Sequence, residues 1–515
     1  MPSTSYILAM PVVIAIDAGT TGVRAIAFDH GGSSVTSAYR EFTQHFPRPG
    51  WVEHDAVEIW ECVQAVLATV VADLADRDEQ VVALGITDQR ETAVVWDRRT
   101  GAPLHRAIVW QDRRTAERCD ELRAAGHLPL VRATTGLGLD AYFSASKLEW
   151  LFTEGGVEPG PEVAFGTVDS WLLWNLTGGT AAAGAIHATD VSNASRTLLF
   201  DIRSRTWSPE LCHLFGVPMH VLPEVRPSSG RFGVTADSVG GIGAGVPVSG
   251  IAGDQQAALF GQACFEPGMT KNTYGTGSFV LMNVGERCPE PVDGLLTTIA
   301  WTIPDPSAPG EVVTHYAYEG AIFATGSAVQ WLRDGLGIID QASEVGPLAA
   351  SIADSEGVVV VPAFTGLGSP WWDPYARGAV LGITRGTGRA HLARAVVEAM
   401  AFQTRDVVDA MSRASGHTVR ALRADGGASA MDLLLQIQAD QLGVPVARPV
   451  VQETTALGAA YLAGLAEGFW SSCEEIAANW VLELEVAPAA DRAAADATYD
   501  RWLRAVTRAG GWAVD

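Results

Sequence analysis

The stretch IAIDAGTTGVRAIAF, Ile14 to Phe28, consists of an apolar run, a turn of Gly and Thr residues, and a second apolar run. It predicts two buried strands joined by a tight turn whose backbone N–H groups can surround a phosphate. The familiar P-loop has a lysine after its glycines and continues into a helix. This turn has no such lysine, and a strand follows it. The stretch therefore predicts a hairpin of another kind, and its ligand has to be inferred from the rest of the chain.

The same design recurs in the second half of the chain. KNTYGTGSFVLMNV, Lys271 to Val284, again gives a strand, a Gly-Thr turn and a strand. Two copies of one hairpin suggest two related domains that face each other. Two unrelated glycine turns are the alternative, because such turns are common.

The segments between the hairpins alternate between helical and strand patterns. Asp55 is expected to cap a helix that has Val57 on its buried stripe, with Glu58 as the reciprocal partner of a capping box. VVALGIT, Val81 to Thr87, is a continuous apolar run of the kind found in strands buried on both faces. This alternation predicts an α/β protein.

Three segments carry polar residues directly after a strand. They are VVALGITDQRE (81–91), VPVSGIAGDQQAALF (246–260) and TVRALRADGGASAMD (418–432). In α/β sheets, ligands bind beyond the carboxyl ends of the strands. We therefore expect these segments to line one cleft between two domains.

Each candidate residue has a functional and a structural interpretation. Asp17 can hold Mg²⁺ near phosphate or can cap its turn. Asp254 can accept a proton from a substrate hydroxyl or can serve only as a helix N-cap. Arg90 and Glu91 can donate to and accept from an alcohol, or can form an exposed ion pair. Considered one by one, these signals leave both interpretations open.

Composition excludes some classes of partner. The chain has 35 Lys+Arg against 59 Asp+Glu, a formal charge of −24, which argues against nucleic-acid and anionic-membrane surfaces. No apolar run reaches the ~18 residues of a membrane-spanning helix. Six scattered cysteines, none in a C-x-x-C pair, are expected to be small buried thiols. A cytoplasmic location, without membrane insertion, is the resulting expectation.

The order of the motifs is more specific than any one of them. PGWVEHD, ITDQRE, IVWQDRRT, TDVSNASRTLLFDI, GIAGDQQAALFGQ, NTYGTGSF, WDPYARG, ADGGAS and TTALGAAYLAGLA follow the first hairpin in this order. The series resembles the FGGY carbohydrate-kinase family, and within it the members that phosphorylate glycerol. The resemblance runs from about Val12 to about Trp470.

The resemblance implies two actin-like, ribonuclease-H-like ATPase domains with a cleft between them, at residues 1–259 and 260–515. It implies transfer of a phosphoryl group from ATP to glycerol with Mg²⁺, in a homo-oligomer, either a dimer or a tetramer. A kinase of another small polyol or sugar is the first alternative. A non-metabolic ATPase with the actin or Hsp70 fold is the second.

The resemblance also implies roles for individual residues. Asp17 and Asp254 are the expected magnesium-side carboxylates, and Asp254 is also the expected catalytic base. The expected glycerol contacts are Arg90, Glu91, Trp110, Tyr142, Asp254, Gln255 and Phe279. The expected ATP contacts are Thr20, Thr21, Gly22 and Arg24 in the first domain, and Thr276, Gly326, Gln330, Gly427 and Met431 in the second.

The chain departs from the family pattern at several places. Ala18 stands where a glutamine is usual, Gly22-Val23 where two serines are usual, and Met431 where an asparagine is usual. These three departures concern the ATP side and put the affinity for nucleotide in doubt. Ala141 replaces a common proline. Some relatives bind fructose 1,6-bisphosphate in a glycine-rich loop. The corresponding loop, Ser238 to Gly250, has no Arg, Lys or His, so we expect neither this inhibition nor histidine phosphorylation there.

Overall fold

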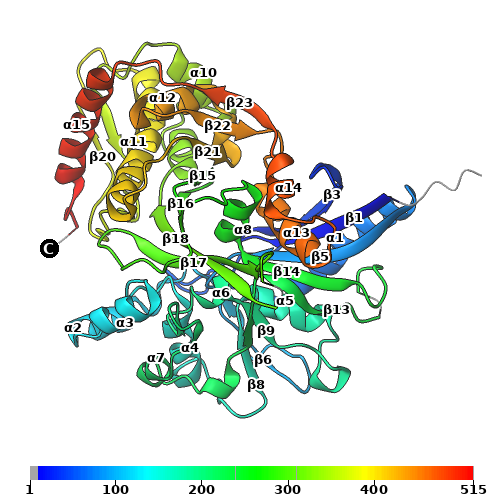
Figure 1. Ribbon diagram of the computed structural model, residues 1–515. Coiled ribbons are helices and arrows are strands. Elements are labelled where there is room, and N and C mark those ends of the chain that lie inside the picture. The colour runs from blue at the N-terminus through cyan, green and yellow to red at the C-terminus, as the bar shows by residue number, and fades with distance from the viewer. Residues whose placement is uncertain (1–9, 238, 309, 514–515) are drawn as a thin grey trace, which may run out of the picture.

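The computed structural model describes residues 10–237, 239–308 and 310–513, and two β-sheets organise them (Figure 1). The first sheet has the strand order β13-β14-β5-β1-β2-β3. Its strands are β1 (Met10–Ala18), β2 (Gly22–Phe28), β3 (Ser34–Glu41), β5 (Glu79–Asp88), β13 (Ser229–Val234) and β14 (Pro247–Gly253).

The second sheet has the strand order β17-β18-β16-β15-β21-β22-β23. Its strands are β15 (Thr270–Tyr274), β16 (Ser278–Gly285), β17 (Leu296–Pro304), β18 (Val312–Ile322), β21 (Leu422–Asp425), β22 (Val446–Pro449) and β23 (Leu482–Val486).

Six strands of the second sheet repeat the topology of the first, and β17 is an additional strand antiparallel to β18. In the first, β1, β2 and β3 are antiparallel, β5 and β14 run parallel to β1, and β13 is antiparallel to β14. In the second, β15, β16 and β18 are antiparallel, β21 and β22 run parallel to β15, and β23 is antiparallel to β22. The hairpins β1–β2 and β15–β16 therefore hold equivalent positions, which confirms the prediction of two related α/β domains.

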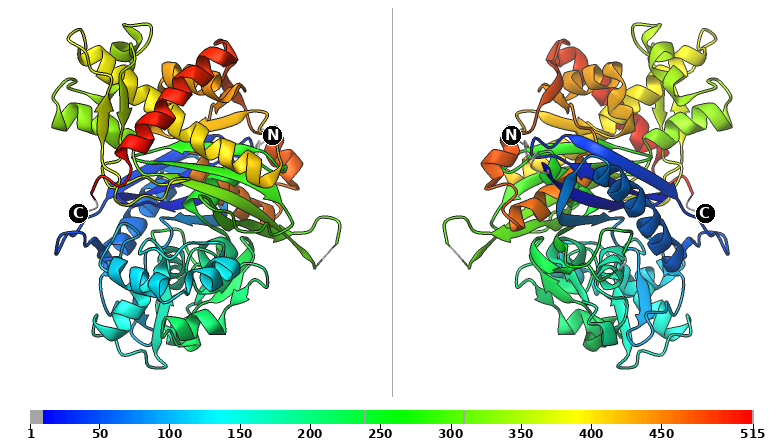
Figure 2. Two further views of the ribbon diagram at one scale, coloured as in Figure 1. Left: turned by 90° about the vertical axis from the view of Figure 1, so that its left-hand side faces the viewer. Right: turned by 90° about the vertical axis from the view of Figure 1, so that its right-hand side faces the viewer.

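Helices cover the outer faces of both sheets (Figure 2). Helices α1 (Ala56–Ala75) and α5 (Val168–Leu176) pack on the first sheet. Helices α11 (Arg389–Ser415) and α12 (Asp432–Leu442) pack on the second.

The start of α1 corrects two details of the sequence analysis. Asp55 caps the helix as predicted, accepting from the backbone N of Val57 at 2.9 Å. The predicted capping box is wrong, because the Glu58 carboxylate accepts instead from the backbone N and hydroxyl of Thr43. Val57 is 44% exposed and does not belong to the buried stripe.

Two helices fill the space between the sheets. Helix α8 (Asp254–Gly261) follows β14, and α13 (Thr454–Ala466) packs against α8 and the first sheet, although it comes late in the chain. Glycines allow this contact: a Cβ at Gly458 would lie 1.8 Å from the Ala257 oxygen, and one at Gly261 would lie 2.0 Å from the Thr454 oxygen. The domain boundary after residue 259 stays a prediction.

The cysteines are mostly buried. Four cysteines are buried, while Cys288 and Cys473 are half-buried, and all six are free. Across residues 10–237, 239–308 and 310–513, no helix is long and apolar enough to cross a membrane.

Candidate active site

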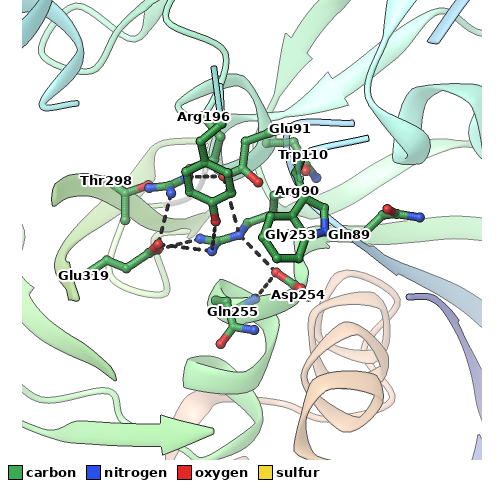
Figure 3. Close-up of polar contacts among 12 residues, drawn as sticks. Gln89, Arg90, Glu91, Trp110, Arg196, Gly253, Asp254, Gln255, Thr298 and Glu319 are labelled. Carbon is green, nitrogen blue, oxygen red and sulfur yellow. Dashed lines mark hydrogen bonds and ion pairs between the residues drawn. The ribbon is translucent and has the colours of Figure 1, made fainter. Parts of the chain in front are cut away.

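The carboxyl ends of β5 and β14 bring together the polar residues that the sequence singled out (Figure 3). These strands are parallel neighbours, and Gly253 pairs with Asp88. Arg90 and Glu91 follow β5, and Asp254 is the first residue of α8. Glu91 has a φ of 62°, a left-handed conformation that costs free energy in a non-glycine residue and is common at functional sites.

Arg90 is buried in a set of carboxylates. Its Nε lies 3.0 Å from Oδ1 of Asp254. Its Nη1 and Nη2 donate to the two carboxylate oxygens of Glu319, at 2.5 and 3.1 Å. The side chains of Arg90 and Glu91 are each 2% exposed, so the alternative of an exposed ion pair is wrong.

A second arginine completes this set. Arg196 donates from Nε to Oε1 of Glu91 at 2.7 Å and from Nη2 to Oε1 of Glu319 at 3.0 Å. Burial alone would raise the pKa of Glu319, but the charges of Arg196 and Arg90 outweigh it and lower that pKa. The sequence analysis assigned no role to Arg196 or Glu319; the only signal for Glu319 was a charge within the otherwise apolar run AYEGAI.

Aromatic side chains surround the Arg90 guanidinium. Phe279 lies under it, with 5.7 Å between the guanidinium carbon and the ring centroid. Arg90 Nη2 lies 3.4 Å from the hydroxyl of Tyr142, and the Tyr142 and Trp110 rings meet edge to face with centroids 5.6 Å apart. Trp110 Nε1 donates to Oγ1 of Thr20 at 3.0 Å. The aromatic wall therefore connects the Arg90 site with the first hairpin.

Gln255 is held by a buried lysine. Its side-chain oxygen accepts from Nζ of Lys271 at 2.5 Å, and Lys271 also donates to the hydroxyl of Thr273 at 2.8 Å. Lys271 is fully buried, and burial lowers its pKa to about 8, with Asp425 and Asp254 opposing the shift. This bond fixes the orientation of the Gln255 amide.

Two carboxylates, Asp17 in β1 and Asp254, lie near each other. Burial first, and the charge of Asp254 second, raise the pKa of Asp17 to about 7. Asp254 is not the N-cap of α8, because Gly253 occupies that position. Within the described ranges, no group of three or more His, Cys, Asp or Glu side chains could hold a metal. An ion such as Mg²⁺ takes one or two protein carboxylates and its other ligands from phosphate and water, and Asp17 and Asp254 are the two carboxylates here that could hold one.

The first hairpin presents its turn to solvent. Thr21 is exposed, and its Oγ1 lies 3.5 Å from the hydroxyl of Tyr39. A Cβ on Gly22 would lie 2.6 Å from that hydroxyl, so Tyr39 occupies space that a side chain at position 22 would need. Arg24, in β2, lies over the Tyr39 ring and forms an ion pair with Glu453, at the start of α13.

His54, from the PGWVEHD motif, supports this turn from behind. Its Nε2 lies 2.7 Å from Oε1 of Gln44, and its Nδ1 lies 3.3 Å from Nε2 of Gln89. The same two amides donate to the backbone oxygens of Thr20 at 2.9 Å and Gly19 at 3.0 Å. This network assigns the His54 proton to Nε2 and the lone pair to Nδ1.

The second hairpin contacts the short helix α9 (Gly326–Gln330). The Gly326 N donates to the Gly275 oxygen at 3.0 Å, and the Ser327 N donates to the Thr276 oxygen at 2.9 Å. A Cβ on Gly326 would lie 2.6 Å from the Gly275 oxygen, so the close approach requires glycine. The turn that contains Thr276 therefore contacts the start of α9 at Gly326, and Gln330 is the last residue of this helix.

The expected adenosine side lies after β21. Gly427 begins the short helix η5 (Gly427–Ala430), and Met431 is the N-cap residue of α12. The Met431 side chain packs near Gly346, where an added Cβ would lie 3.2 Å from Met431 Cγ. Met431 thus takes part in packing of the second domain.

Residues 12–261 match the N-terminal domain of the FGGY family of carbohydrate kinases, and residues 270–467 match its C-terminal domain. The protein named glycerol kinase 2 of Thermotoga maritima is 53% identical over 507 residues, which cover 98% of this chain and 99% of that protein.

Solved structures agree with this match. The Plasmodium falciparum glycerol kinase with ADP superimposes with a TM-score of 0.90 at 34% identity, covering 97% of this chain and 98% of that one. A ligand-bound xylulose kinase from Lactobacillus acidophilus has a TM-score of 0.84 at 21% identity, covering 97% of both chains, and supports the fold alone.

Proposed function

The chain belongs to the FGGY family of carbohydrate kinases, and from this premise we propose that it transfers the γ-phosphoryl group of ATP to glycerol, giving sn-glycerol 3-phosphate. The observation that carries the proposal is the buried pair of Arg90 and Glu91 beside Asp254. The 53% identity to a protein named glycerol kinase 2 supports glycerol as the substrate.

A small polyol suits the chemistry of this site. Each hydroxyl of glycerol donates one hydrogen bond and accepts others, and Arg90 offers donors while Glu91 offers acceptors. Phe279 and Tyr142 contact the guanidinium, Trp110 packs against Tyr142, and the three rings would contact the carbon backbone. A larger sugar would need the space that these rings occupy.

Asp254 would orient a terminal hydroxyl and accept its proton. The hydroxyl oxygen forms the new bond to the γ-phosphorus, the bond from that phosphorus to the β–γ bridging oxygen breaks, and ADP leaves. Such transfers depend mostly on positioning and electrostatic stabilisation. Arg90 Nε, 3.0 Å from Asp254 Oδ1, would share that carboxylate with the substrate.

The two hairpins would hold the nucleotide. Backbone N–H groups and hydroxyls of the two turns suit phosphate oxygens. The proposed contacts are Thr20, Thr21, Gly22, Arg24, Thr276, Gly326 and Gln330, with Gly427 and Met431 on the adenosine side. Arg24 would exchange Glu453 for phosphate. Mg²⁺, when bound near Asp17 and Asp254, supplies positive charge that offsets the charge of the phosphates.

A kinase of another polyol or sugar is the alternative within the family. A non-metabolic ATPase is a weaker one, since it would not need Arg90, Glu91 and their aromatic surroundings together. A cytoplasmic location and a dimer or tetramer remain predictions.

The test is ADP release with glycerol, dihydroxyacetone, erythritol, ribitol and xylulose as separate substrates. We expect the highest kcat/KM with glycerol. A higher value for erythritol or xylulose would reassign the substrate, and ADP release that ignores every alcohol would support the ATPase alternative.

A further inference from the structure

Arg90, Glu91, Arg196 and Glu319 form a connected group of charges in the interior, and Arg90 also contacts Asp254. We call them the buried quartet; two are positive and two are negative. Arg196 and Glu319 have side chains that are 0% exposed, and those of Arg90 and Glu91 are 2% exposed. Taking four charges out of water is costly, and buried ion pairs often contribute little net stability. Stability alone is therefore a weak reason for this arrangement.

Glu319 determines which N–H groups of the Arg90 guanidinium are available to a substrate. Both of its oxygens bind the outer edge of the guanidinium, formed by Nη1 and Nη2. The second N–H of Nη1 donates to Oε1 of Gln256 at 3.2 Å. The donors that remain on the reacting side are Nε, next to Asp254, and the N–H of Nη2 that points to Tyr142.

The quartet also joins the two domains. Arg90 follows β5 of the first sheet, whereas Glu319 lies in β18 of the second, opposite Leu281 of β16. The same strand β16 carries Phe279, which lies under the Arg90 guanidinium. The second domain therefore supplies one aromatic side chain of the site, Phe279, and the carboxylate that orients Arg90.

Arg196 orients Glu91, as Glu319 orients Arg90. It holds Oε1 of Glu91 through Nε and shares Oε1 of Glu319 with Arg90 (Figure 3). Its Nη1 is buried without a hydrogen-bond partner in the structure. An unsatisfied buried donor costs free energy, which fits a side chain placed to orient Glu91 and Glu319 and not to maximise its own bonding.

We propose that Glu319 and Arg196 are positioning residues of the substrate site: Glu319 fixes the edge of Arg90 that meets the substrate, and Arg196 fixes Glu91. This inference rests on the proposed glycerol kinase activity. Neither residue touches the reacting atoms. Together they determine which of the two terminal hydroxyls of glycerol, a prochiral molecule, faces Asp254.

The test compares Glu319→Gln with wild type. The amide keeps the shape but replaces one acceptor with a donor, which faces the N–H groups of Arg90 and breaks the two-oxygen contact. We expect the glycerol KM to rise by about tenfold or more, since a hydrogen bond to a charged group is lost from a buried site. The ATP KM should stay within about threefold, because the quartet includes no hairpin residue.

A second readout is stereochemical. The product is assayed with a dehydrogenase specific for the sn-3 enantiomer, and total ADP gives the total turnover. For wild type, the ratio of sn-3 product to total ADP should be near one. Glu319→Gln should lower this ratio, because a less firmly held Arg90 lets either terminal hydroxyl of glycerol reach Asp254. A merely structural role would not change this ratio.

The matched control is Asp406→Asn, in α11. Asp406 is 2% exposed and accepts from Trp371, Tyr499 and Trp502, none of which belongs to the site. We expect it to lower the melting temperature without changing the glycerol KM or the product ratio.

Each outcome bears on the proposal. A folded Glu319→Gln variant with unchanged glycerol KM and product ratio would overturn it, and so would equal rises in both KM values. If that variant does not fold, Arg196→Lys is the deciding variant. It keeps the positive charge but cannot donate to Glu91 and Glu319 as the guanidinium does, and an unchanged glycerol KM would overturn the proposal. Wild-type protein without activity on glycerol would refute the proposed function instead.

Discussion

Acidification is expected to destabilise this protein through His54. The side chain is 0% exposed and lies between the amides of Gln44 and Gln89. Burial first, and the nearby His45 second, lower the pKa of His54 to about 3. Protonation would place an N–H on Nδ1, which would then face the amide donor of Gln89.

The magnitude follows from proton linkage. The unfolded chain has an ordinary histidine pKa of 6.5, so it binds a proton below that pH while the folded state stays neutral down to about pH 3. The stability that the neutral His54 contributes is therefore fully present above pH 6.5 and is lost as pH falls toward 3. At pH 5 the loss is about 2 kcal/mol, from ~1.5 pH units at ~1.36 kcal/mol each.

The assay is urea unfolding followed by tryptophan fluorescence at pH 7 and pH 5, for wild type and His54→Gln. We expect wild type to lose about 2 kcal/mol more than the variant over this interval. His187, whose pKa burial lowers to about 4, contributes an equal loss to both proteins. His213→Gln, at an exposed position, is the control and should behave as wild type. Equal losses in wild type and His54→Gln would refute the reasoning.

The remaining predictions concern the site and its regulation. Asp254→Asn should lower kcat by ~10²–10⁴ in single-turnover and steady-state assays, because the variant loses the group that accepts the proton. A near-normal kcat would show that the role of Asp254 is only structural. Arg90→Ala should raise the glycerol KM by about 10-fold to 150-fold, from ~1.5–3 kcal/mol per charged hydrogen bond, and an unchanged KM would contradict the proposed contact. Met431→Asn should modestly tighten ATP binding in calorimetry, since it adds a polar group on the proposed adenosine side; weaker binding would show that the packing of Met431 near Gly346 matters more. Fructose 1,6-bisphosphate should not inhibit at saturating glycerol, because the described residues 239–250 offer no basic side chain; Ser238 lies outside the described residues, and saturable inhibition would place an effector site elsewhere.

Elements with a strong local pattern could be predicted from the sequence. The stretch from Ile14 to Phe28 forms the hairpin β1–β2, and the stretch from Lys271 to Val284 forms the hairpin β15–β16. Continuous apolar runs bounded by Gly and Thr determine both, because strand burial and turn chemistry act over a few residues. The three segments with polar residues directly after a strand (81–91, 246–260 and 418–432) could be predicted for the same reason.

Pairings between distant side chains could not be predicted. Arg90 and Glu319 are separated by 229 positions, and Arg196 and Glu319 by 123. The periodic pattern of apolar residues carries no information about which charged side chains pair in the fold. A glutamate in a buried strand is compatible with any of the arginines. The same limit applies at shorter range to Glu58, which accepts from Thr43, 15 positions earlier, and not from the helix start that its spacing suggested.

Gly22 shows how a departure from a family pattern depends on its surroundings. Read alone, glycine in place of a usual serine removes a hydroxyl from the phosphate hairpin and suggests weaker nucleotide binding. The structure places the Tyr39 hydroxyl 2.6 Å from where a Cβ at position 22 would lie, and 3.5 Å from Oγ1 of Thr21. A hydroxyl is thus present at the turn, supplied from β3 and not from the turn itself. A side chain at position 22 would also meet the backbone oxygen of Arg40, 2.7 Å from the Cβ position, so the glycine fits the close approach of β3 to this turn.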